Sequence, residues 1–166
     1  MKNIISVFVF ISLVFACQSP KEKLLNQITE LENSDSAFSI GQITDLYWAY
    51  ASFVERYPDD EHAPEFLFKA AQRSPILNKA SEGITFFEKL VANYPNSKFC
   101  EQALFSIAFS YEDNLNDFVN AKKYYEQFLL KYPNSELAED AKLSIKNLGK
   151  SDEEFLESIN NDSIVN

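Results

Sequence analysis

The side chains best suited to chemistry are few in this chain of 166 residues, which has one histidine, His62, and two cysteines, Cys17 and Cys100. A metal takes about four ligands and a nucleophile needs a nearby base, so both kinds of site require several such groups close together. No second histidine and no cysteine cluster accompanies His62, and no Gly-rich phosphate loop or Ser/His/Asp set is recognisable. The sequence therefore predicts no catalytic residue, no metal site and no cofactor.

Acidic residues are abundant, and the formal net charge is −10. Paired carboxylates such as Asp59-Asp60 and Glu153-Glu154 stand at expected helix starts, where the helix dipole favours them, so capping explains them without acid–base catalysis. The negative charge disfavours binding to nucleic acid and to anionic lipid headgroups. Two interpretations stay open: the acids attract a basic partner, or they only keep many helix faces soluble.

The elements of the chain follow one pattern that occurs three times. An aromatic-rich apolar stretch ends in Tyr57-Pro58, Tyr94-Pro95 and Tyr132-Pro133, and each pair is followed by a polar turn and a second apolar stretch. The prolines are 37 and 38 residues apart, and self-similarity at such a spacing is typical of repeat architectures.

Each copy predicts two helices with the Tyr-Pro pair between them. In the third copy, apolar residues follow the helical period from Ala121 to Leu129, and proline then ends the helix near Tyr132. Ser135 is expected to cap the next helix, Ser97 takes its place in the second copy, and Asp59 or Asp60 in the first. Small residues recur at matched positions, where they let helix backbones approach: Ala63, Cys100, Ala103, Ala138 and Ala141.

Helix periodicity and end signals extend this plan to most of the chain. A capping box at Ser19 and Glu22 predicts a first helix through Leu31, and Trp48 is expected in the core. The remaining helices are expected at about 43–57, 61–73, 79–93, 98–113, 117–132 and 136–148, with Gly149 as a C-cap and a last short helix that opens at Ser151 and bears Phe155, Leu156 and Ile159.

This pattern resembles the tetratricopeptide repeat (TPR). Ala121, Tyr125, Phe128 and Pro133 follow the small–aromatic–apolar–Pro spacing of its second helix, and Ala108 and Tyr111 resemble positions of its first. The repeat spacing exceeds the usual length of about 34 residues, and one extra residue lies between Tyr111 and Ala121. The resemblance implies an all-α fold in which antiparallel helical hairpins stack as a TPR-like right-handed α-solenoid.

In TPR folds the first helix of each pair lines the concave face, so the resemblance implies a set of partner-binding residues. That set is Glu65, Phe68, Gln72, Gln102, Phe105, Phe109, Glu112 and Leu143. A groove with phenylalanines rimmed by Glu and Gln suits a peptide or helix with apolar anchors. The alternative is that Phe68, Phe105 and Phe109 pack inside the array.

The first 16 residues predict a signal peptide, because Lys2 is followed by an apolar run that is short for a membrane span. The run ends Leu13-Val14-Phe15-Ala16-Cys17, which resembles the bacterial lipobox and implies a lipid on Cys17. The alternative is a secreted protein with a free Cys17. Cys100 occupies a position that is alanine in the other copies, which favours a small buried side chain over a reactive thiol.

The expected organisation is a signal peptide at 1–16, a lipidated Cys17 and short tether at 17–20, a helical array at 21–149 of about three hairpins plus a helix, and a short helix with a frayed tail at 150–166. The Tyr-Pro-Asn-Ser turn and the long spacing are similar to TPR lipoproteins of bacterial envelopes, among them those of the β-barrel assembly machine and of the Tol–Pal system. That similarity implies a non-catalytic scaffold, anchored by lipid at the outer membrane and facing the periplasm. Its partners would be other envelope proteins, with no nucleic acid and no small-molecule substrate. The alternative is a structural or dimerising subunit without a groove.

Overall fold

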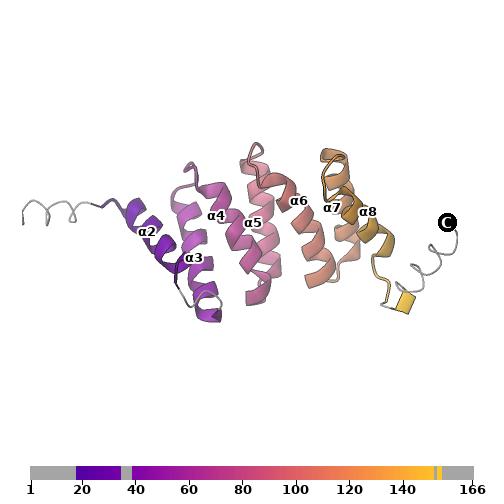
Figure 1. Cartoon of the computed structure of the whole chain (residues 1–166), viewed down its shortest axis with the longest axis horizontal. Helices are drawn as coiled ribbons and strands as arrows, with labels where there is room; N and C mark the ends of the chain where they lie inside the picture. Colours follow the sequence, from indigo (N-terminus) through magenta and orange to yellow (C-terminus); the bar gives the residue numbers. More distant parts are fainter. Residues whose placement is uncertain (1–17, 35–38, 152, 155–166) are drawn as a thin grey trace, which may run out of the picture. The chain divides into compact units, whose positions relative to one another are not determined.

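The computed structural model describes residues 18–34, 39–151 and 153–154 (Figure 1). All regular structure in these ranges is helical, which confirms the all-α prediction. The expectations for the leader, for Cys17 and for Phe155, Leu156 and Ile159 lie outside the described residues. The chain divides into two compact units, Met1–Phe66 and Leu67–Asn166, and each is described by itself.

Unit 1 contains α2 (Pro20–Glu32), α3 (Ile40–Arg56) and the first turn of α4 (Ala63–Arg73). Ser19 caps α2 as predicted, since its hydroxyl accepts from the Glu22 backbone N–H and the Glu22 carboxylate accepts from the Ser19 N–H. Helix α3 starts at Ile40, three residues earlier than expected, because Ser39 caps it. Tyr50 and Phe53 are fully buried and contact the Phe66 ring, with centroids 5.1 and 4.9 Å away.

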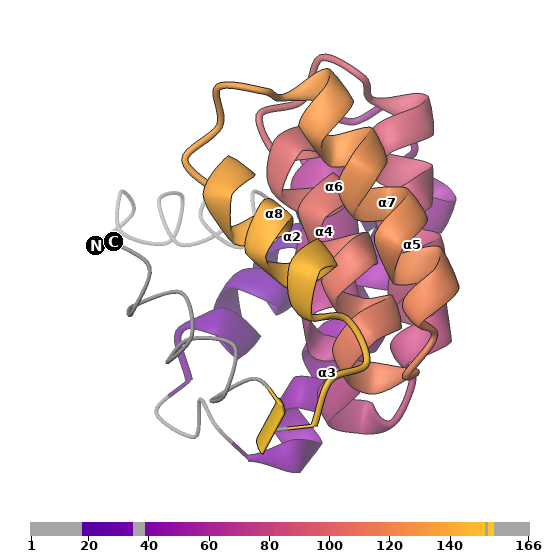
Figure 2. The same ribbon diagram turned by 90° about the vertical axis from the view of Figure 1, so that its right-hand side faces the viewer.

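Unit 2 contains the rest of α4, a short 3-10 turn η2 (Pro75–Leu77), α5 (Ala80–Asn93), α6 (Cys100–Phe109), the π-helical segment η3 (Ser110–Asn114), α7 (Phe118–Lys131) and α8 (Ala138–Asn147). Within this unit α5 packs on α6, α6 on α7, and α7 on α8, as Figures 1 and 2 show. Sequential packing of this kind is how a helical hairpin buries an apolar face that it cannot bury alone.

The three Tyr-Pro pairs end their helices in the same way. Tyr57, Tyr94 and Tyr132 are the C-caps, with φ of −133°, −128° and −129° and ψ of 59°, 56° and 60°. Each tyrosine N–H still donates to the carbonyl four residues earlier, but the proline that follows has no N–H to donate. The repeated phrase therefore produces a repeated turn, as predicted.

The predicted caps after these turns are displaced. Ser97 and Ser135 accept from the N–H of Phe99 and Leu137, but α6 and α8 begin later, at Cys100 and Ala138. The two serines thus stabilise the turn that precedes each helix, and the prediction that they are the N-caps is wrong. Asp60 acts similarly in the first copy, where its carboxylate accepts from the His62 N–H at 3.0 Å.

Small residues at the matched positions are buried as predicted: Ala63, Cys100, Ala103, Ala138 and Ala141. Gly83 of α5 shows how close the approach becomes. A Cβ atom there would lie 2.8 Å from the Ser74 Cβ and 3.0 Å from the Ala71 carbonyl oxygen. Only glycine lets α5 lie this close to the end of α4 without a shift of backbone.

Trp48 is not in the core, so that prediction is wrong. Its side chain is 55% exposed, whereas Tyr47 and Tyr50 are buried. Successive residues of a helix point about 100° apart, so Trp48 shares a stripe with Asp45 and Ser52 instead. The aromatic residues next to Trp48 in the sequence therefore do not indicate which side of α3 Trp48 lies on.

The extra residue between Tyr111 and Ala121 is absorbed by η3. Its hydrogen bonds span five residues rather than four, with the Leu115 N–H donating to the Ser110 carbonyl at 3.2 Å. A π-helical turn holds one residue more than an α-helical turn. The long repeat spacing is thus accommodated inside unit 2 without breaking α6 or α7.

Candidate functional site

The predicted binding residues lie on α4, on α6 with η3, and on α8, which are the first helices of their pairs. Glu65 belongs to unit 1 and the other seven to unit 2. Gln72, Gln102, Phe109 and Leu143 are exposed, and Phe105 and Glu112 are half-buried. Binding by these residues stays a prediction, but their surroundings differ greatly.

Phe68 belongs to the core of unit 2 rather than to an open surface. It is 6% exposed, and its ring lies 5.6 Å from Phe87 of α5 and 5.1 Å from Phe99, which precedes α6. These two rings cover it. The groove interpretation therefore does not hold for Phe68, which offers no ring to a partner.

Phe105 and Phe109 differ although both lie on α6. The Phe105 ring meets Tyr125 and Phe128 of α7 edge-on, at 5.4 and 5.5 Å between centroids, and is half-buried. Phe109 is 48% exposed. Phe109 is thus the one of the three predicted phenylalanines with a substantially open ring.

A hollow of about 340 Å³ adjoins Phe109, and we call it the Phe109 groove. Its walls are Gln72 at the end of α4 and Phe109 of α6, with Phe87 of α5 also lining it. Its rim holds Asp113 and Asn114 of η3 and Pro75 of η2, which sequence reasoning missed. The spacing of Phe109 and Asp113 by four residues is the signal that could have found the acid.

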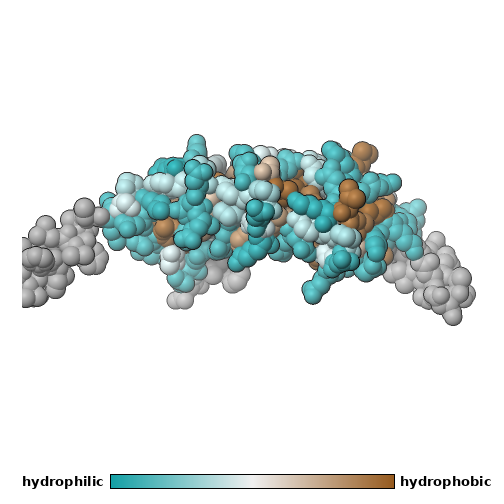
Figure 3. Space-filling model, turned by 90° about the horizontal axis from the view of Figure 1, so that it is seen from above, coloured by the Kyte–Doolittle hydropathy of each residue, from teal (hydrophilic) through white to brown (hydrophobic). Residues whose placement is uncertain are grey.

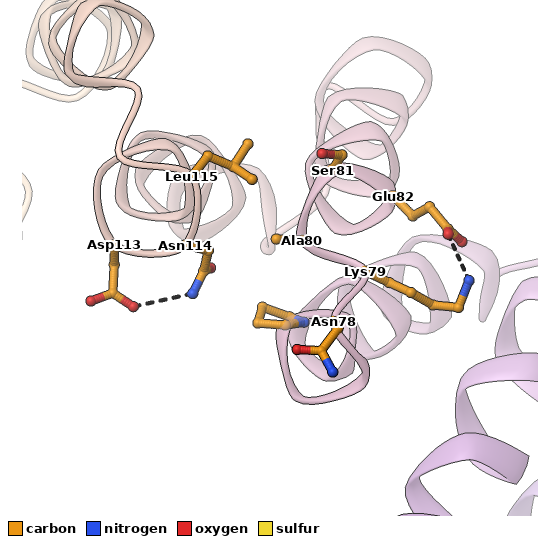
Figure 4. A pocket seen from close by; sticks show the side chains of 9 residues that line it. Asn78, Lys79, Ala80, Ser81, Glu82, Asp113, Asn114 and Leu115 are labelled. Atoms are coloured by element: carbon orange, nitrogen blue, oxygen red, sulfur yellow. Dashed lines mark hydrogen bonds and ion pairs between the residues drawn. The ribbon is translucent and has the colours of Figure 1, made fainter.

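A second hollow of about 480 Å³ continues from this rim, since it shares Pro75, Asp113 and Asn114 with the first. Figure 4 shows Asp113, Asn114 and Leu115 on one side of it and the start of α5, at Ala80 to Glu82, on the other. The loop residue Asn78 adopts positive φ of 58°, a conformation that asparagine tolerates well. The two hollows together form one depression on unit 2.

The charged residues that line this depression are Lys79, Glu82 and Asp113, so it has one carboxylate in excess. Glu82 pairs with Lys79 at 2.6 Å. Asp113 accepts from the Asn114 side chain at 3.1 Å, and within the described ranges it forms no ion pair. An exposed carboxylate next to an exposed aromatic ring suits a cation beside an apolar side chain.

The remaining chemical candidates have structural roles. His62 Nδ1 lies 2.7 Å from Asp60, and no cluster able to hold a metal occurs among the described residues. Cys100 is buried, its thiol donates to the Tyr94 carbonyl, and burial raises the pKa of the thiol. A raised thiol pKa disfavours the nucleophilic thiolate.

No helix in the described part of the chain is long and apolar enough to cross a membrane. Figure 3 shows a mostly hydrophilic face, with apolar side chains gathered over the α7 and α8 region. The exposed large apolar residues of that region are Phe118, Val119, Leu130 and Leu143.

Comparison with protein families gives a match at residues 67–97 and 102–135, to the tetratricopeptide repeat. Two tetratricopeptide repeats are therefore detected in unit 2. The first covers α4 from Leu67 and α5, and the second covers α6 from Gln102, η3 and α7. The match and the sequential packing of helices show a TPR-like helical fold. A comparison with curated proteins returned no match.

The two repeats indicate a scaffold for protein–protein interaction. TPR arrays are typically non-catalytic scaffolds that mediate contacts between proteins, and no enzymatic domain is matched. Function still depends on the particular surface, because one fold serves many partners.

Proposed function

We propose that this chain is a non-catalytic scaffold that holds a partner protein in the Phe109 groove. The observation that carries the proposal is the exposed Phe109 ring at the edge of a hollow within the two detected repeats. The partner segment would place an apolar side chain against Phe109 and a basic side chain near Asp113. The net charge of −10 supports a basic segment, since it speeds the encounter with a cationic partner.

We also propose that the scaffold is anchored by a lipid on Cys17, at the outer membrane and facing the periplasm. The support is the lipobox-like run from Leu13 to Cys17 and the similarity of the Tyr-Pro-Asn-Ser turns to envelope TPR lipoproteins. Helix α2 starts at Pro20, so the tether would be three residues long or less and would hold unit 1 near the bilayer. A role in outer-membrane or envelope assembly would fit that position.

Photo-crosslinking in cells tests the groove directly. A photoreactive residue at position 109 should capture a partner that mass spectrometry identifies, whereas one at position 119 should not. Val119 is the matched control, because it is 82% exposed and does not line the groove. Equal capture at both positions, or none at 109, would refute the groove.

Growth with a labelled fatty acid tests the anchor separately. The chain should take up the label, and Cys17→Ser should abolish uptake and release the protein from the membrane fraction. Because Cys17 is outside the repeats, a negative result would remove the anchor and leave the scaffold proposal intact.

A structural or dimerising subunit is the second candidate. It is favoured by the burial of Phe68 and the partial burial of Phe105, which leave a smaller open surface on unit 2 than expected.

A further inference from the structure

One face of the α2–α3 hairpin, within unit 1, carries a hollow of about 510 Å³ with the exposed Trp48 at its edge. Leu24 and Leu31 of α2 and Ala49 and Ser52 of α3 line it. A large aromatic side chain gains most from burial, yet Trp48 stays 55% exposed. The face thus presents a bulky side chain beside a cavity with small residues.

The charged side chains of this face lie at the two ends of one stripe of α3. Asp45, Trp48, Ser52 and Arg56 are spaced i, i+3, i+7 and i+11, which puts them on one stripe of the helix. The carboxylate is at one end and the guanidinium is at the other, about 16 Å away along the axis. Neither Asp45 nor Arg56 forms an ion pair with any other described residue.

We propose that this face binds a second copy of the chain through a two-fold interface in which the two α3 helices run antiparallel. Asp45 of each copy then meets Arg56 of the other, so the interface contains two ion pairs. In the same register Trp48 of one copy lies against Ser52 of the other, so each indole enters the other copy's hollow. A two-fold interface requires such a self-complementary surface.

The stripe favours a second copy over other occupants. A lipid bilayer offers apolar chains and headgroups but no carboxylate and guanidinium in reversed order, and it would leave Asp45 and Gln27 poorly solvated. Binding to an unrelated protein would not require opposite charges at the two ends of the stripe, whereas a two-fold interface does. The self-association goes beyond the groove of unit 2 and does not depend on the lipid anchor.

Charge reversal in cells tests the symmetry. Two full-length copies with different tags are co-expressed, and one is purified while the other is quantified. Asp45→Arg alone or Arg56→Asp alone should weaken recovery about tenfold or more, because like charges then face each other. A copy with Asp45→Arg paired with a copy carrying Arg56→Asp should recover wild-type association, since both ion pairs are restored.

Rescue in the mixed pair is the deciding result. A fold defect, a membrane contact or a third protein would leave the mixed pair as weak as each single variant, and that outcome would overturn the proposal. Recovery unaffected by either single variant would overturn it too.

Trp48 is the only tryptophan of the chain, so its fluorescence reports on this face alone. Emission of the purified full-length protein should shift to shorter wavelength as its concentration rises, and Asp45→Arg should suppress the shift. Trp48→Ala should reduce recovery of the tagged copy, whereas Ile76→Ala, a 54% exposed residue of unit 2, should not. A shift that appears only on addition of phosphatidylethanolamine vesicles would identify a lipid contact instead and overturn the proposal.

Discussion

The phenol of Tyr125 in α7 donates a hydrogen bond to Glu112 of η3, over 2.7 Å. Tyr125 is fully buried, and this burial together with the Glu112 carboxylate raises the pKa of the phenol well above its usual value. The phenol therefore remains a donor at all physiological pH values. The bond fastens the π-helical segment to α7 and so helps to position Asp113 at the Phe109 groove.

Tyr125→Phe should lower the free energy of unfolding by about 1.5–3 kcal/mol, since a hydrogen bond to a charged group is lost. It should also weaken partner binding, because η3 loses its tie to α7. Urea unfolding and a binding titration measure the two effects. Tyr124→Phe is the matched control: it loses the bond to Glu88 of α5, so it should lower stability while leaving binding unchanged. Equal effects of both variants on binding would contradict the role of Glu112.

Asp60 should make unit 1 acid-sensitive. Its carboxylate accepts from the His62 N–H and pairs with Lys21 Nζ at 2.9 Å, and these contacts, with His62 first, hold the pKa of Asp60 well below 3.8. A lowered folded-state pKa stabilises the protein fully above the unfolded-state value of 3.8, and the stabilisation is lost as pH falls below it. Asp60→Asn should therefore be less stable than wild type at neutral pH, and the difference should shrink below pH 3.8.

Thermal unfolding followed by circular dichroism from pH 7 down to pH 2 would show this loss. The neighbouring Asp59→Asn serves as the control, because exposed Asp59 forms none of these contacts. A constant difference between wild type and Asp60→Asn over the whole pH range would contradict the assignment.

In Gly83→Ala the new Cβ would overlap Ser74 and the Ala71 carbonyl, which costs about 1–3 kcal/mol. Alanine's better helix propensity offsets about 1 kcal/mol of this cost, so the net destabilisation should reach about 2 kcal/mol. Gly41→Ala is the opposite case, since the nearest atom to its new Cβ would be the Ser39 Oγ at 4.0 Å. This variant should raise the free energy of unfolding by about 0.4–1 kcal/mol. Chemical denaturation of both variants gives the comparison, and a stabilising Gly83→Ala would show that α4 and α5 are not in close contact.

Phe68→Ala and Phe109→Ala should separate stability from binding. Truncation of the buried Phe68 should lower the free energy of unfolding by about 3–5 kcal/mol. Truncation of the half-exposed Phe109 should lower it by much less. Partner affinity should fall for Phe109→Ala and, under conditions where the variant is folded, change little for Phe68→Ala. Loss of affinity in both to the same extent would mean that the groove extends over Phe68 in solution.

Local features of the fold could be predicted from the sequence because they depend on neighbouring residues. Proline removes a donor and excludes helical angles from the residue before it, so the ends of α3, α5 and α7 followed from Pro58, Pro95 and Pro133. The capping box at Ser19 and the turn at Gly149, whose φ is 74°, are equally local. The helix starts after the Tyr-Pro turns were misplaced because Ser97 and Ser135 can cap either a helix or a short turn.

The candidate site depended on more distant contacts. The TPR resemblance placed Phe68, Phe105 and Phe109 on the concave face, but Phe68 is covered by Phe87 and Phe99, and Phe105 meets Tyr125 and Phe128. Asp113 lines the groove beside Phe109 from η3, the π-helical segment that continues α6.

The sequence by itself determined a helical repeat, its proline-terminated turns and the small residues at its closest contacts, since each follows from backbone chemistry or from a spacing within one helix. Tertiary structure alone decided which aromatic side chains stay open, placing Phe68 inside and Trp48 outside. The physical reason is that a side chain is buried by whichever neighbouring helix covers it, and that neighbour is specified by packing rather than by residues adjacent in sequence.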